Sequence, residues 1–208
     1  MSVIDKLASS LNRRDEIPNQ ELAKEIVLSQ DIEAVKVLVE NLSNKKAIQN
    51  DCIKVLYEIG GHAPKLISKY INEFIAQLSS KNNRLQWGAM TALGTITRER
   101  PKEIYTALPA ILFAADKGSV ITKDHAMNIL IALCSQKDYA KNTFPLLIEQ
   151  LLKSPTNQLP MYAERAIPII NDQNKILFVK TLASRLDDIE KETKRKRVEK
   201  VIKKFNGQ

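Results

Sequence analysis

Three eight-residue segments of the chain repeat one apolar pattern at intervals of 37 residues. The segments CIKVLYEI, AMTALGTI and AMNILIAL begin at Cys52, Ala89 and Ala126, and a weaker copy, AERAIPII, begins at Ala163. The matching apolar residues of each copy stand at positions i, i+4 and i+7, which lie on one face of a helix. A fixed period of this length is typical of stacked helical repeats, so it constrains the fold more than any other feature of the sequence.

Each copy follows a second amphipathic stretch and a short polar link, so the repeated unit is helix, turn, helix. Pro18, Pro64 and Pro101 stand at or next to expected helix starts, where a missing N–H group costs nothing. Gly60 and Gly61 are expected to end a helix with a positive φ. The expected helix pairs are 3–12 with 19–29, 31–42 with 45–60, 64–79 with 84–98, 101–115 with 120–135, 138–153 with 159–171, and 173–188 with 190–206.

The segment RLQWGAMTALGTITRERP, residues 84–101, resembles the second helix of a HEAT repeat in the HEAT/armadillo family. The resemblance covers residues 31–172 and, more loosely, the whole chain. It implies an all-α fold, an α-α superhelix (HEAT-like solenoid) of about six antiparallel pairs, in one domain over residues 1–208. Residues 1–30 would then form an N-terminal cap and residues 173–208 a basic C-terminal capping pair. Such proteins usually bind a protein or peptide on their concave face, which predicts a non-catalytic, monomeric protein-interaction scaffold.

The composition agrees with a helical protein that contains few turns. Aromatic residues make up 5% of the chain, and it has only six glycines. Cys52 and Cys134 both lie in apolar helical patterns, where a buried thiol is expected rather than a disulfide. The N-terminus lacks the apolar core of a signal peptide, and no apolar run approaches ~20 residues. We therefore expect a cytoplasmic protein that does not enter a membrane.

The net charge of +8 is concentrated near the C-terminus. Residues 190–208 hold eight lysines and arginines against three glutamates. Two interpretations stay open: a solvated capping helix, or a contact with nucleic acid or another polyanion. The residues expected to make a polyanion contact are Lys194, Arg195, Lys196 and Arg197.

The only tryptophan, Trp87, defines the best candidate binding surface. It lies about 160° from Ala89 around the expected helix, on the side away from the buried face. Equivalent positions in the other repeats give a mixed polar, charged and aromatic column on the expected concave face. The candidate binding residues are Lys54, Trp87, Thr91, Arg98, Asp124, Asn128 and Arg165. The alternative is that Trp87 lies flat over a neighbouring repeat and fills a groove between helices.

The sequence contains no motif that requires catalysis, a metal or a cofactor. Cysteine and histidine do not cluster with metal-ligand spacing, and no Gly-flanked nucleophile or phosphate-binding loop is present. The alternative function is nucleic-acid binding through the basic C-terminal helix. The chain is similar to the HEAT-like alkylpurine DNA glycosylases in charge, length and helicity. In that family an aspartate lies one helical turn after a tryptophan, whereas here Thr91 lies one turn after Trp87, so no catalytic residue is expected.

Overall fold

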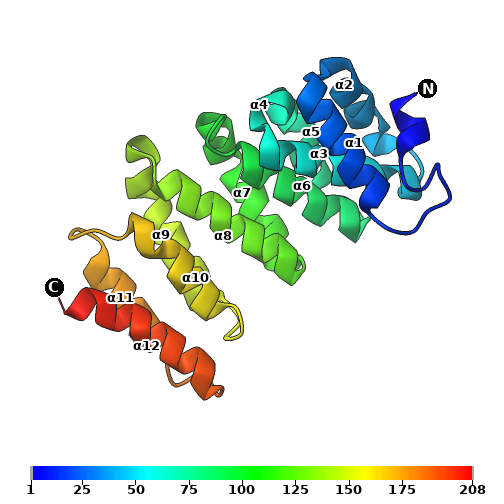
Figure 1. The fold of residues 1–208 in the computed structure, drawn as a ribbon. Helices are drawn as coiled ribbons and strands as arrows, with labels where there is room; N and C mark the ends of the chain where they lie inside the picture. The colour runs from blue at the N-terminus through cyan, green and yellow to red at the C-terminus, as the bar shows by residue number, and fades with distance from the viewer. Residues whose placement is uncertain (1, 208) are drawn as a thin grey trace. The chain divides into compact units, whose positions relative to one another are not determined.

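The computed structural model describes residues 2–207, the side chain of Asn206 excepted, and over that range it contains helices and no strand (Figure 1). The prediction of an all-helical protein is therefore confirmed. The α-helices are α1 (Ile17–Ser29), α2 (Ile32–Glu40), α3 (Lys46–His62), α4 (Pro64–Ile67), α5 (Ile71–Gln77), α6 (Asn83–Ile96), α7 (Pro101–Lys117), α8 (Val120–Cys134), α9 (Lys137–Lys153), α10 (Leu159–Ala166), α11 (Lys175–Ala183) and α12 (Glu192–Asn206). Short 3-10 turns occur at η1 (Val3–Lys6), η2 (Asn41–Ser43), η3 (Ser68–Tyr70) and η4 (Ile167–Ile169).

Local sequence signals account for several helix boundaries. Pro64 and Pro101 occupy the first positions of α4 and α7, where proline removes no helical hydrogen bond. Asp31 caps α2, because its carboxylate accepts a hydrogen bond from the backbone N–H of Ala34 at 2.8 Å. Gln30 ends α1 in the left-handed conformation, with a φ of 54°.

The helix expected over residues 3–12 does not form, and only the short turn η1 occupies this stretch. The backbone N–H of Ala8 donates to the Asn19 side chain at 3.0 Å, and that of Ser9 donates to Asp51 at 2.8 Å. Asn19 also donates to Asp51 at 2.9 Å, so the two buried side chains form a small network. The side chains of Asn19 and Asp51 accept hydrogen bonds from backbone N–H groups that a helix would use for its own hydrogen bonds. The segment is therefore irregular instead of helical.

The expectation that Gly60 and Gly61 end a helix with a positive φ is also wrong. Helix α3 continues to His62, and neither glycine has a positive φ. A Cβ atom added to Gly60 would lie 2.2 Å from Oγ1 of Thr95 and 2.7 Å from Cδ1 of Ile67, whereas one added to Gly61 would meet nothing within 4 Å. Gly60 therefore allows α3 to approach α6 closely, which is a packing role rather than a turn role.

The chain divides into two compact units, residues 1–126 and 127–208, with the boundary inside α8. In the first unit the second helices of successive pairs pack side by side, α1 against α3 and α3 against α6 (Figure 1). The first helices form a second layer, in which α2 contacts α4 and α5 contacts α7. The first unit is thus built from two layers of helices.

The second unit repeats this arrangement within itself. Helix α10 packs against α12, and α9 packs against α11. The layers are joined by contacts of α9 with α10 and of α11 with α12. Packing of like helix on like helix is expected for repeats that bury their apolar faces against neighbours in the sequence.

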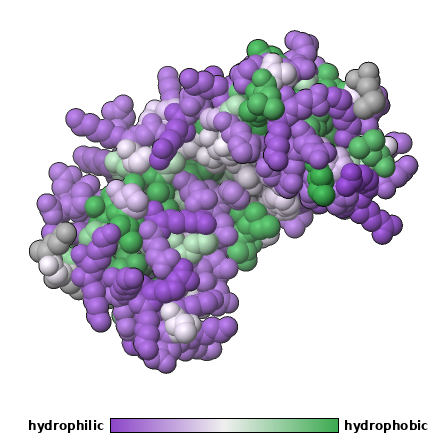
Figure 2. Space-filling view, viewed as in Figure 1, coloured by the Kyte–Doolittle hydropathy of each residue, from purple (hydrophilic) through white to green (hydrophobic). Residues whose placement is uncertain are grey.

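The repeated apolar positions lie in the hydrophobic core between the helices, as the 37-residue period predicts. In the first three copies all nine positions are at most 2% exposed; they are Cys52, Leu56, Ile59, Ala89, Leu93, Ile96, Ala126, Leu130 and Leu133. In the fourth copy Ala163 is buried, but Ile167 and Ile170 are half-exposed because α10 ends at Ala166. Figure 2 shows hydrophilic side chains over most of the visible face, with hydrophobic ones in separate patches. Over residues 2–207, no helix combines the length and the apolar character needed to cross a membrane.

Candidate functional site

Trp87 lies in the second-helix layer of the first unit, where α6 packs against α3. Its ring contacts that of Tyr57 on α3, with centroids 5.8 Å apart and planes tilted by 46°. Both side chains are half-buried. The ring of Trp87 therefore leans on the neighbouring second helix and keeps part of its surface accessible to a partner.

Lys54 was expected on an open column beside Trp87, and this prediction is wrong. The residue is only 8% exposed, and its ammonium is held by two neighbours on α3. Its Nζ donates to Oε1 of Glu58 at 2.5 Å and lies 4.9 Å from the ring centroid of Tyr57. Residues three and four positions apart share a helix face, so this arrangement follows from the local sequence. Burial acts to lower the pKa of Lys54, but its bonds to Glu58 and Tyr57 outweigh burial and raise the pKa above its ordinary value.

A second ion pair lies close to the aromatic pair. The guanidinium of Arg84 on α6 donates to Oε1 of Glu16, which immediately precedes α1. Burial raises the pKa of the Tyr57 hydroxyl, and Glu16 is close enough to add to that shift. We call these side chains the Trp87 cluster, defined as Glu16, Lys54, Tyr57, Glu58, Arg84 and Trp87.

Two polar atoms of the Trp87 cluster have unused hydrogen-bonding capacity. Nε of Arg84 and Oε2 of Glu16 are both buried, and neither has a hydrogen-bond partner among the described residues. Buried polar atoms are nearly always paired with protein or water, so an unpaired donor beside an unpaired acceptor needs an explanation. Both atoms belong to the Arg84–Glu16 ion pair, so a second hydrogen bond within that pair is the simplest explanation, and a partner meets only the outer edge of the two side chains, each 36% exposed.

The remaining predicted binding residues behave in different ways. The Thr91 hydroxyl donates to the backbone carbonyl four residues before it at 2.9 Å, so its own helix uses it. Arg98 is exposed just beyond the end of α6, and Asp124 is half-exposed on α8. In the second unit Arg165 of α10 donates to Oδ1 of Asn128 on α8 at 3.1 Å. These two positions are 37 residues apart, so the predicted register does bring equivalent residues together there.

Sequence reasoning missed Tyr57, Glu16 and Arg84. Tyr57 could have been found, because it stands three residues after Lys54 and so shares its helix face. The pairing of Glu16 with Arg84 joins positions 68 residues apart and carries no local signal. Only the packing of α1, α3 and α6 into one layer brings them together.

The basic residues proposed for a polyanion contact all have partners within the second unit. Arg197 of α12 donates two hydrogen bonds to the Glu164 carboxylate on α10, at 2.8 and 2.6 Å. These bonds lower the pKa of Glu164 and raise that of Arg197. Lys194 donates to Oδ1 of Asn157 at 2.5 Å. The other two pair locally: Arg195 with Asp187 and Glu199, and Lys196 with Glu192.

This pairing ties α12 to the rest of its unit. The bidentate ion pair of Arg197 with Glu164 is the strongest of these contacts, because two parallel hydrogen bonds join groups of opposite charge. A polyanion would have to compete with the carboxylates already bound to this belt. Its residues are therefore less available to a ligand than their sequence indicates.

The described residues include no group of three histidine, cysteine, aspartate or glutamate side chains that could hold a metal ion. Cys52 and Cys134 are free and buried, and burial raises the pKa of each thiol to about 12. A thiol is reactive only as the thiolate, so both are inert at neutral pH while the protein is folded.

No family model and no curated protein matches the chain. A solved structure does: the crystal structure of an engineered protein from the Northeast Structural Genomics Consortium. It is 20% identical in sequence and superposes with a TM-score of 0.63, over 98% of this chain and 100% of that chain. At this level of identity the similarity concerns the helical fold alone.

Proposed function

We propose that the chain is a non-catalytic protein-interaction scaffold, a HEAT-like solenoid that holds a peptide or protein segment against its second-helix layer. The Trp87 cluster is the anchor of this interaction. The observation that carries the proposal is the half-exposed aromatic pair next to the partly exposed ion pair of Arg84 with Glu16.

The chemistry of the cluster suits a polypeptide partner. Tryptophan, tyrosine and arginine are enriched where binding energy concentrates in protein interfaces. The exposed edges of the Arg84 guanidinium and the Glu16 carboxylate can donate to a carbonyl and accept from an amide N–H. Each peptide unit carries one group of each kind. The rings of Trp87 and Tyr57 would supply the apolar contact area.

Nucleic acid is the competing partner, and the charges favour it less. A phosphate backbone is bound mainly by lysine and arginine side chains that release counterions. Lys54 and the belt of α12 are engaged with partners inside the protein, which leaves fewer free cations than the net charge of +8 indicates. The proposal therefore predicts binding that persists at physiological salt.

The test is selection of a random peptide library displayed on phage against the immobilised chain. We expect enriched sequences that bind wild type and lose binding at least tenfold with Trp87→Ala. Titration of an enriched peptide should also shift the emission of the single tryptophan. Glu16→Gln removes the carboxylate charge at the anchor and should weaken binding without disturbing the α6 fold.

Lys102→Met is a matched control, because Lys102 is exposed on α7 and lies outside the Trp87 cluster. Circular dichroism of each variant shows whether the helices are kept. Enriched peptides that bind Trp87→Ala as well as wild type would contradict the proposal. Tight, strongly salt-dependent binding of labelled duplex DNA that is lost on deletion of residues 190–208 would favour nucleic acid instead.

A further inference from the structure

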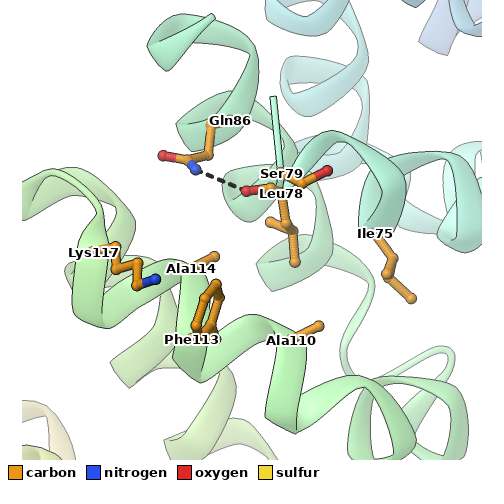
Figure 3. Close-up of a pocket in the computed structure, with 8 residues that line it drawn as sticks. All are labelled: Ile75, Leu78, Ser79, Gln86, Ala110, Phe113, Ala114 and Lys117. Atoms are coloured by element: carbon orange, nitrogen blue, oxygen red, sulfur yellow. Dashed lines mark hydrogen bonds between the residues drawn. The ribbon is translucent and has the colours of Figure 1, made fainter. Parts of the chain in front are cut away.

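A groove lies between α5 and α7 in the first-helix layer of the first unit, and it does not involve Trp87. Its volume is about 460 Å³, and its apolar wall consists of Ile75, Leu78, Ala110, Phe113 and Ala114. Figure 3 shows the Leu78 and Phe113 side chains pointing into the space between the two helices. This volume lies within the range of sites that bind small ligands or single side chains of a partner.

Phe113 is the most unusual residue of the groove. It is 61% exposed although it lies within α7, four residues before the helix ends, and Pro109 and Ala110 continue an exposed apolar strip along the same helix. An isolated exposed apolar residue needs no explanation, but an aromatic ring at the edge of an apolar groove is typical of an interaction site.

The charge at the groove is a single ammonium. Nζ of Lys117 lies 3.9 Å from the ring centroid of Phe113, in a cation–π contact, and pairs with no carboxylate among the described residues. Asp116 stands one position earlier, about 100° around the helix, and forms no ion pair with it. Lys117 is thus held over the groove with its charge available to an incoming anion.

A hydrogen-bond acceptor lies at the opposite side of the groove. The Gln86 amide Nε2 donates to the backbone carbonyl of Leu78 at 2.7 Å, which fixes the orientation of the side chain (Figure 3). Its Oε1 has no partner among the described residues. An amide N–H of a bound chain could donate to this oxygen.

We infer that this groove binds a segment of a partner protein in which an aliphatic or aromatic side chain stands next to a carboxylate. The apolar side chain fills the space between α5 and α7 and contacts Phe113. The carboxylate pairs with Lys117, and a backbone N–H donates to Gln86. Charge complementarity selects this partner, because the groove presents one cation and no anion to its occupant.

The inference can be tested with the smallest molecule that carries these three features, N-acetyl-L-leucine. Its neutral analogue, N-acetyl-L-leucinamide, has the same side chain and no carboxylate. Each is titrated into the isotope-labelled full chain and followed by two-dimensional NMR. A compound with twelve non-hydrogen atoms is expected to bind with a Kd on the order of 1 to 5 mM, and its shifts should centre on Ser79, Gln86, Ala110 and Phe113.

The carboxylate should bind about two- to fivefold more tightly than the amide, as expected for one exposed ion pair. Lys117→Met keeps the aliphatic stem and should abolish this preference while both compounds still bind. Phe113→Ala should weaken both compounds. Lys102→Met removes another exposed lysine of α7, roughly 22 Å along the helix, and should change nothing.

Three results would overturn the inference. The first is no localised shift for either compound up to about 20 mM, well above the expected Kd. The second is equal affinity of wild type for the two compounds, or a preference that survives in Lys117→Met. The third is movement of the groove resonances with protein concentration alone, which would assign the groove to a second copy of this chain. None of these results depends on Trp87, so the proposed function can fail or stand independently.

Discussion

Two adjacent glycines in α3 offer a direct test of how closely the second helices pack. Alanine at Gly60 would place its Cβ 2.2 Å from Oγ1 of Thr95 and 2.7 Å from Cδ1 of Ile67, whereas alanine at Gly61 would meet open space. The Ile67 methyl group is the end of a flexible side chain and can move. Thr95 cannot move as easily, because its Cβ would lie 3.1 Å from the new atom and its hydroxyl bonds the Ala92 carbonyl at 2.7 Å.

The expected magnitudes follow from two opposing effects. Replacing glycine by alanine in a helix stabilises it by about 0.5–1 kcal/mol, and this gain applies to both positions. Overpacking a buried contact costs about 1–3 kcal/mol, and this cost applies only to Gly60. Gly61→Ala should therefore be more stable than wild type, and Gly60→Ala should be less stable than Gly61→Ala by about 1–3 kcal/mol. The comparison cancels the helix-propensity gain and leaves the steric cost.

The free energy of unfolding can be measured by urea denaturation. Trp87 fluorescence reports on α6, which packs against α3, and circular dichroism reports on all helices. The two signals must coincide before a two-state free energy is assigned. Adding Thr95→Ala to Gly60→Ala should restore part of the lost stability, since it removes the closest atom. Equal stability of the two glycine variants would refute the reasoning about close packing of α3 and α6.

Three further predictions concern other parts of the chain. Ala126→Leu should overpack a position that is 2% exposed and lower the free energy of unfolding by about 1–3 kcal/mol, as measured by urea denaturation. Cys52 and Cys134 should react with a thiol reagent only on unfolding, because burial raises both pKa values to about 12; fast labelling of the native chain would contradict this. The pKa of Glu164 is lowered by its bonds to Arg197, so this pair stabilises the fold above the unfolded pKa of glutamate and loses that contribution as the pH falls through the folded pKa. Arg197→Met should remove the contribution of this pair to the pH dependence of stability. The contribution is less than about 1 kcal/mol for so exposed a pair, and thermal unfolding measured against pH tests it.

The sequence was sufficient to predict most of the helices and the buried faces of the repeated ones. The 37-residue period identified Ala89, Leu93 and Ile96 as core positions because a helical face needs apolar residues three and four apart, and all three are fully buried. The period gives no indication that residues 3–12 are not helical. That result depends on Asn19 and Asp51, two polar side chains that bind the backbone of this segment from α1 and α3.

The candidate site was predicted less well, because helix geometry fixes a direction but not a neighbour. The angle around the helix correctly predicts that Trp87 points away from the face of Ala89. It cannot predict the contact of the Trp87 ring with Tyr57, because Tyr57 lies on another helix. The same reasoning placed Lys54 on an open surface. The i, i+4 spacing predicts its pairing with Glu58, but its burial carries no local signal.

The two candidate surfaces differ in how their charges are balanced, and this difference bears on what each can bind. In the Trp87 cluster every cation already has a carboxylate partner, as Lys54 has Glu58, so an incoming anion would gain little and would leave a half-buried glutamate with a weaker partner. Selectivity there must come from contact area and from neutral backbone groups that meet the exposed edge of the Arg84–Glu16 pair. In the groove between α5 and α7 the ammonium of Lys117 lies over a ring that attracts it but cannot neutralise its charge. A carboxylate can still be added there at no cost to an existing ion pair, which is why an anionic partner fits the groove and a neutral polypeptide fits the Trp87 cluster.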